Sequence, residues 1–166
     1  MALFKEVIIL TSFLTSFVNA LALSLPYWTK DESDRYVGLW HTCIDDICSP
    51  VAEASEIKTT VSKIFLCFAQ FTLFSTFLTS LLIPLKGTSE IFNKICLSVL
   101  FIFSGSFALI SWALYAKYFM DIPISSVKLH ASFALAVLST AFSYVGVMVV
   151  FLNKPQKISS QEEIAM

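Results

Sequence analysis

The chain has 166 residues and a formal net charge of −1, and 57% of its residues are hydrophobic. Only 14% are charged, whereas a typical soluble domain carries about 25%. This composition argues against a soluble cytosolic enzyme and indicates a membrane protein. The absence of any basic excess gives no support to nucleic-acid binding.

Four apolar segments, taken in chain order, each approach the roughly 20 residues needed to cross ~30 Å of hydrocarbon. Because a membrane-spanning segment must satisfy its own backbone hydrogen bonds, we predict that all four are helices. The predicted helices cover residues 7–25, 64–83, 95–116 and 129–152. The expected fold class is therefore all-α transmembrane, a four-helix bundle. Residues 1–152 form a single four-span membrane domain, and the polar residues 153–166 form a cytoplasmic tail.

The first apolar segment has an alternative interpretation. Lys5 followed by an apolar run and by Val18-Asn19-Ala20 is also typical of a signal peptide with a small-residue cleavage site. The run nevertheless continues to Leu25 and makes a full span without cleavage. We therefore favour a retained helix.

Residues 26–63 form the longest polar segment and contain Cys43 and Cys48, with four residues between them. A disulfide between these cysteines would contribute about 2 kcal/mol by the chain-entropy estimate. It would also fix a turn, and the strand-forming residues 36–40 favour a hairpin there. Only His41 lies close enough in sequence to add a ligand, so we expect no metal site.

The orientation of the chain follows from this cysteine pair. Lys and Arg are nearly balanced between the two sides, so their distribution does not decide it. Disulfides persist in oxidising compartments and are rare in the cytosol. We therefore predict that residues 26–63 are extracellular, that both termini are cytoplasmic, and that the protein is in the plasma membrane.

Two amide side chains, Asn19 and Gln70, lie inside apolar segments at a similar depth. We predict that they face the bundle interior and hydrogen-bond to each other, a contact worth about 0.6 to 2 kcal/mol. Small residues recur four positions apart in several segments, which lets helix backbones approach closely. Cys96, at the predicted cytoplasmic edge of the third segment, is a candidate for reversible palmitoylation, with a buried inert thiol as the alternative.

Residues 26–63, which we call the first loop, also carry a group of residues with a recognisable spacing: Trp28, Gly38, Leu39, Trp40, Cys43 and Cys48. On a four-span frame, this group resembles the signature of the claudin superfamily. The short cysteine gap is closer to the lens-intrinsic membrane protein and claudin-domain-containing branches, which are related to peripheral myelin and epithelial membrane proteins.

This resemblance implies a left-handed four-helix bundle with a small extracellular antiparallel β-sheet formed mainly by the first loop. It also implies that Trp28 and the Leu39-Trp40 pair anchor that sheet at the outer membrane edge, where indole rings are favoured in any case. The chain departs from tight-junction claudins in its short first loop and in its last residues, Glu163–Met166, which make only a weak PDZ-domain ligand.

The sequence shows no catalytic constellation, and it has essentially no ionisable residues between the ends of its predicted spans. We therefore expect neither an enzyme nor a cofactor. We favour a claudin-like protein that organises cell contacts or membrane assemblies through its first loop. Its expected partners are membrane lipids and further copies of itself. The alternative is an auxiliary subunit for a channel, receptor or other integral membrane protein. A paracellular ion pore, suggested by the acidic first loop, is less favoured.

Overall fold

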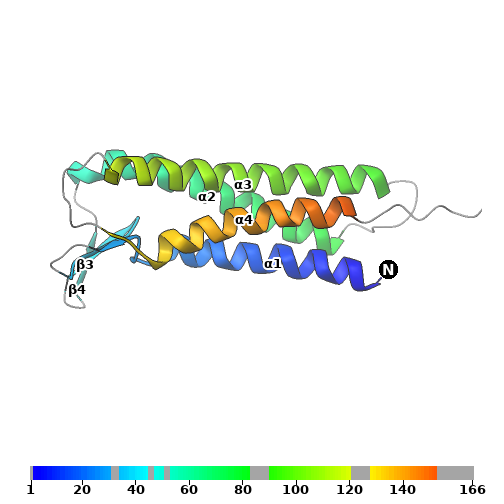
Figure 1. Ribbon diagram of the computed structural model, residues 1–166, viewed down its shortest axis with the longest axis horizontal. Helices are drawn as coiled ribbons and strands as arrows, with labels where there is room; N and C mark the ends of the chain where they lie inside the picture. The colour runs from blue at the N-terminus through cyan, green and yellow to red at the C-terminus, as the bar shows by residue number, and fades with distance from the viewer. Residues whose placement is uncertain are drawn as a thin grey trace, which may run out of the picture.

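The computed structural model describes residues 2–30, 34–44, 47–50, 53–82, 90–120 and 128–152. Four long helices run side by side along an elongated molecule (Figure 1): α1 (Ala2–Ser24), α2 (Glu53–Leu82), α3 (Glu90–Met120) and α4 (Ala131–Leu152). α1 packs against α2 and α4, and α3 packs against the same two helices. The predicted four-helix bundle is confirmed.

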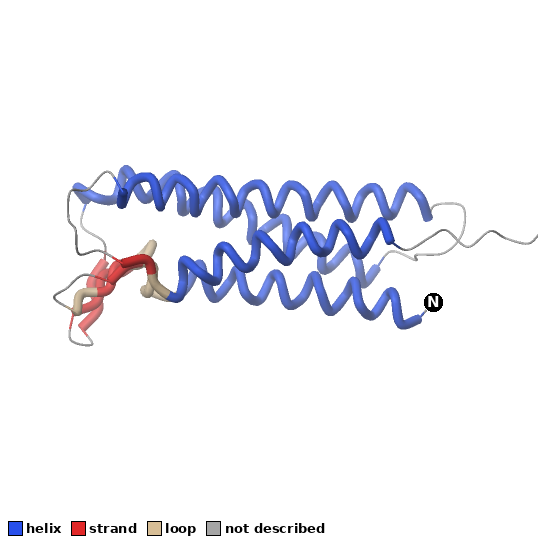
Figure 2. Tube along the Cα trace, viewed as in Figure 1, coloured by secondary structure: helices blue, strands red, loops and turns tan. Residues whose placement is uncertain are grey.

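A small antiparallel sheet lies at one end of the bundle (Figure 2), which we call the sheet end. Its strands are β1 (Thr29–Lys30), β2 (Tyr36–Val37), β3 (His41–Ile44), β4 (Ile47–Pro50) and β5 (Lys128–Leu129). They pair in the order β4-β3-β2-β1-β5. The first loop contributes all but one of these strands, which confirms the sheet expected from the resemblance. α1 begins and α4 ends at the opposite end (Figure 1).

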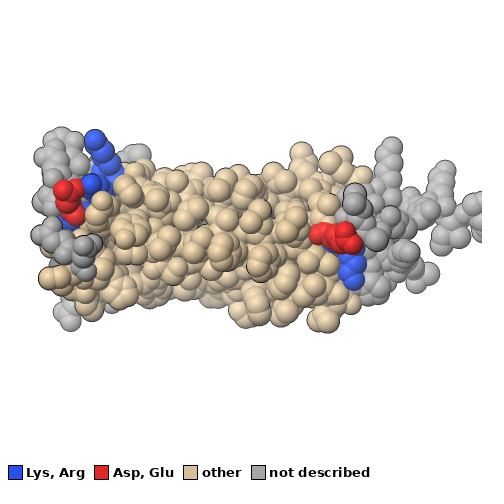
Figure 3. Space-filling model, turned by 90° about the horizontal axis from the view of Figure 1, so that it is seen from below, with Lys and Arg blue, Asp and Glu red and all other residues tan. Residues whose placement is uncertain are grey.

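All four helices contain a stretch long and apolar enough to cross a membrane: Lys5–Ser24, Thr59–Leu82, Ile91–Lys117 and Ala131–Leu152. Figure 3 shows one face of the molecule, on which the charged side chains lie at the two ends and an uncharged band separates them. A band without charges is what hydrocarbon requires of a protein surface. These features support the prediction of a multi-pass membrane protein.

The helix boundaries differ from the predicted ones where polar residues continue a helix. α2 begins at Glu53 rather than at residue 64, and α3 covers Glu90–Met120 rather than residues 95–116. Hydropathy detects only the apolar part of a helix, and a helix need not end where the membrane ends. α4 begins at Ala131 rather than at residue 129, because Leu129 belongs to β5 (Lys128–Leu129).

Strand β5 joins the start of α4 to the segment that follows α1. Thr29 pairs with Leu129 in the β1–β5 register. The backbone N–H of His130 donates to the carbonyl of Trp28 at 2.9 Å, and that of Ser132 donates to the carbonyl of Tyr27 at 2.9 Å. We call these backbone contacts the β1–β5 clamp. They fix the sheet ends of α1 and α4 to each other.

The interior of the bundle contains many small and hydroxyl-bearing side chains. Buried examples are Ser12, Ser16, Thr76, Ser80, Ser104, Ser132, Ala136 and Thr140. Many large apolar side chains lie on the outer surface, among them Phe13, Phe68, Phe71 and Phe74. A Cβ atom at Gly146 of α4 would lie 2.7 Å from the Phe101 ring of α3. Small residues therefore allow the close helix contacts that the spacing predicts.

Candidate functional site at the sheet end

Two indole side chains satisfy carbonyl groups at the end of α1. The last four carbonyls of a helix have no partner within it, and Pro26 has no N–H with which to continue the pattern. The Nε1–H of Trp28 donates to the carbonyl oxygen of Ala22 at 2.8 Å. The Nε1–H of Trp40 donates to the carbonyl oxygen of Leu23 at 2.9 Å. Both tryptophans of the first loop therefore cap α1.

The two tryptophans lie in different environments. Trp28 has no exposed surface, and its ring centroid lies 4.7 Å from that of Tyr115 and 6.2 Å from that of Phe133. Leu39 is also fully buried in the same apolar cluster, whereas Trp40 is 41% exposed. The expectation that all three residues anchor the sheet at the outer membrane edge stays a prediction; the structure shows that Trp28 and Leu39 are packed inside the bundle. These two residues anchor the sheet from inside the bundle.

Gly38 stands where the sheet approaches the end of α1 most closely. A Cβ atom at this position would lie 2.5 Å from the Cα of Pro26, a backbone atom that cannot move aside cheaply. The Gly38 N–H donates to the carbonyl of His41 at 2.8 Å and tightens the turn between β2 and β3. Only glycine fits this position without moving the loop away from α1.

A disulfide joins Cys43 and Cys48, as predicted. The two residues are paired directly across β3 and β4, with their Cα atoms 4.0 Å apart. Ile44 and Ile47, on either side of the tip of this hairpin, are 46% and 77% exposed. β4 is the outermost strand of the sheet and is exposed along its whole length. The hairpin is thus an edge braced by a disulfide, with an exposed isoleucine on either side of its turn; the turn residues, Asp45 and Asp46, lie outside the described part of the chain.

The other side of the sheet carries an aromatic cluster. The rings of Tyr27, Tyr36 and His130 lie within 5.1 to 6.2 Å of one another, centroid to centroid. Lys30 Nζ lies 5.2 Å from the centroid of Tyr36 and 2.6 Å from a carboxylate oxygen of Asp34. The hydrogen bond with Asp34, more than that with Tyr36, raises the pKa of Lys30 above its usual 10.5. The ammonium therefore stays charged at physiological pH.

Asn19 and Gln70 meet in the bundle interior, where the sequence analysis places them. Asn19 Nδ2 donates to Gln70 Oε1 at 3.0 Å. Gln70 Nε2 in turn donates to the hydroxyl of Ser16 at 3.1 Å, and the hydroxyl of Ser139 donates to Asn19 Oδ1 at 3.2 Å. This network connects α1, α2 and α4. Sequence reasoning missed Ser16 and Ser139 because the apolar segments contain many hydroxyl residues that differ little in context.

Lys63 is a residue that the sequence analysis assigned to the first loop and that the structure places on α2. Its side chain is only 8% exposed, and its Nζ lies 5.2 Å from the ring centroid of Trp40. The sequence does not predict this contact, because a lysine next to an apolar segment is common. Only the position of the sheet on the bundle brings Trp40 to Lys63.

The remaining predicted sites are less informative. Cys96 is half-buried on α3, and its palmitoylation stays a prediction. The candidate PDZ ligand and the rest of residues 153–166 lie outside the described part of the chain. Among the described residues, no group of three or more His, Cys, Asp or Glu side chains is placed to hold a metal ion.

No protein-family model matches the chain, and no curated protein matches it. The claudin resemblance therefore depends on the residues described above.

Proposed function

We propose that the protein is a non-enzymatic, claudin-like protein of the plasma membrane, and that it organises cell contacts by binding a second copy of itself on the facing membrane. In this proposal the sheet end is extracellular and both termini are cytoplasmic. The disulfide supports this orientation, because such bonds persist in oxidising compartments. The resemblance carried by Trp28, Gly38, Leu39 and Trp40 supports the family.

The braced hairpin β3–β4 is the observation that carries the proposal. Ile44 and Ile47, on either side of the hairpin turn, are 46% and 77% exposed. The hairpin lies at the sheet end of the bundle, which is one of the two ends that carry charged side chains in Figure 3. An edge strand also offers unpaired backbone groups to a partner strand. Burial of a fully exposed isoleucine contributes about 1.5 to 3 kcal/mol. Two such tips meeting across a contact would bury these side chains together.

A cell-mixing experiment tests the proposal. Non-adherent cells that express a tagged copy are mixed with untransfected cells, and the tag is imaged at both kinds of contact. We expect accumulation only where both neighbours express the protein. Ile47→Asp should abolish this enrichment, because it replaces the more exposed of the two isoleucines with a charged side chain. Leu129→Asp is the matched control, since Leu129 is 43% exposed on β5 at the opposite edge of the sheet.

Surface biotinylation of both variants keeps the comparison valid, because each must reach the plasma membrane in equal amount. An even distribution of the wild-type protein over the cell surface would contradict homotypic adhesion. That outcome would favour the alternative of an auxiliary subunit, which predicts a stoichiometric partner after purification in mild detergent.

A further inference from the structure

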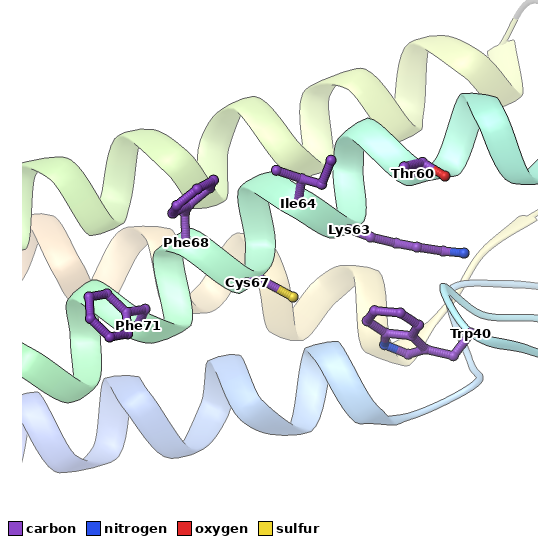
Figure 4. Close-up of a pocket in the computed structure, with 7 residues that line it drawn as sticks. All are labelled: Trp40, Thr60, Lys63, Ile64, Cys67, Phe68 and Phe71. Carbon is purple, nitrogen blue, oxygen red and sulfur yellow. The ribbon is translucent and has the colours of Figure 1, made fainter.

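A groove on the surface of the bundle lies beside Trp40 and along the half of α2 nearer the sheet (Figure 4). Its volume of about 700 Å³ falls within the ~300–1,000 Å³ of typical small-molecule sites. Its apolar wall is formed by Ile64, Cys67, Phe68 and Phe71 of α2. Figure 4 shows Cys67 and Trp40 directed toward the space between the helices, and Lys63 extended toward the sheet.

The sheet end of the groove holds a positive charge. The side chain of Lys63 is more than nine-tenths buried, and its Nζ rests over the ring of Trp40. Glu6 and Asp34 are the acidic residues whose side chains the structure describes, and neither forms an ion pair with Lys63; Asp34 pairs with Lys30 instead. A buried ammonium requires an anion or several hydrogen-bond acceptors to offset its lost hydration. The ring of Trp40 supplies only part of that compensation.

The position of the groove along α2 matches one leaflet of a membrane. The apolar stretch of α2 begins at Thr59, so Lys63 lies near its sheet end, at the depth where Lys and Trp side chains meet lipid headgroups. From Lys63 to Phe71 the helix rises ~12 Å at ~1.5 Å per residue. Half of the hydrocarbon core measures ~15 Å. A ligand in the groove would therefore have its charge at the headgroup level and its apolar part beside the acyl chains.

We propose that this groove binds one glycerophospholipid of net negative charge, with its phosphate on Lys63 Nζ and one acyl chain along Ile64, Cys67 and Phe71. The positive charge of Lys63 favours an anionic headgroup, and the apolar wall of the groove favours an acyl chain. The proposal is independent of the adhesive function, because it concerns the lateral face of the bundle rather than the hairpin tip.

Native mass spectrometry of the purified full-length protein tests the headgroup. The protein in detergent is titrated with phosphatidylglycerol and, separately, with phosphatidylcholine. We expect one tightly bound phosphatidylglycerol, with phosphatidylcholine bound about tenfold more weakly. Lys63→Gln should weaken phosphatidylglycerol binding about tenfold, the effect of losing one charge-assisted hydrogen bond. Lys63→Arg should retain it, since a guanidinium also binds phosphate.

Lys30→Gln is the matched control, because it removes one positive charge from the same end of the molecule without touching the groove. Equal binding of the two lipids, or equal loss of binding in Lys63→Gln and Lys30→Gln, would overturn the proposal. Binding of inorganic phosphate in place of the lipid would also overturn it, because the acyl chain would then contribute nothing.

The two free cysteines report the position of the acyl chain. Cys67 lines the groove and is exposed, whereas Cys96 lies on α3 outside it. Added phosphatidylglycerol should slow the alkylation of Cys67 by a small maleimide about tenfold and leave that of Cys96 unchanged. Equal protection of both thiols would mean nonspecific lipid coating, and it would contradict a site in the groove.

Discussion

Two tryptophans of one loop perform the same chemical task in two environments. Each donates an indole N–H to a carbonyl at the end of α1, one from inside the bundle and one from its surface. Trp28 is fully buried, so no water can replace its hydrogen bond. Trp40 is partly exposed, and water can approach the carbonyl that it caps. The energetic weight of the two caps should differ accordingly.

Replacement of each tryptophan by phenylalanine tests this difference. Trp28→Phe keeps an aromatic ring but leaves the carbonyl of Ala22 without its donor, which costs about 1 to 3 kcal/mol. Trp40→Phe makes the same chemical change at a half-exposed position and should cost less than half as much. The measurement is the fraction of monodisperse protein that survives heating in detergent. Equal losses for the two variants would refute the role of burial.

At the scale of the elements, the network around Asn19 and Gln70 connects three of the four helices. Its partners are buried or half-buried, and the single proton of the Ser139 hydroxyl can go either to Asn19 Oδ1 or to the carbonyl of Ala136 within α4, 2.9 Å away. The serine therefore retains a partner when the amides are removed. An amide that loses its partner in an apolar interior has no such alternative.

A double-mutant cycle measures this coupling. We expect Asn19→Leu and Gln70→Leu each to destabilise the bundle, because each leaves the other amide without its partner. The double variant should be more stable than the sum of the two single effects predicts, by about 0.6 to 2 kcal/mol. The free energies come from unfolding in mixed micelles. Strict additivity would show that the two amides do not interact in the membrane protein.

The sequence predicts the spans, the disulfide and the amide pair because each depends on local composition or on simple depth along a helix. It does not predict the first turns of α2 from Glu53, since polar residues carry no hydropathy signal even when they are helical. Nor does it predict that Trp28 is buried while Trp40 is exposed. The two residues are chemically identical, and only the packing of the sheet on the bundle distinguishes them.

Strand β5 is another feature that the sequence does not predict. Leu129 is the first residue of the predicted fourth helix, and Lys128 precedes that helix in the loop, yet both pair with β1. Pairing between distant segments decides their conformation, and a short strand leaves no periodic pattern. The contact of Lys63 with Trp40 also joins distant segments. Those parts of the site that arise from tertiary contacts therefore required the structure.

At the scale of the whole molecule, α1 begins and α4 ends at the same end of the bundle, away from the sheet (Figure 1). In the proposed orientation, epitope tags fused to the two termini should both become accessible to antibody only after the plasma membrane is permeabilised. An impermeant amine reagent should label Lys30 in intact cells, because it lies on the sheet. Staining of either tag in intact cells would contradict the proposed orientation.

The β1–β5 clamp also affects how a mechanical force passes through the protein. A pull on the hairpin tip passes through the strands β3, β2 and β1 to β5 by backbone hydrogen bonds. From there it enters α1 and α4, the two helices that carry the chain termini at the far end. α2 receives the load by a second route, because β4 of the same hairpin ends at Pro50 and the chain enters α2 at Glu53. Tension at a contact would therefore be transmitted across the membrane along α1 and α4 through the sheet, and along α2 through the chain itself.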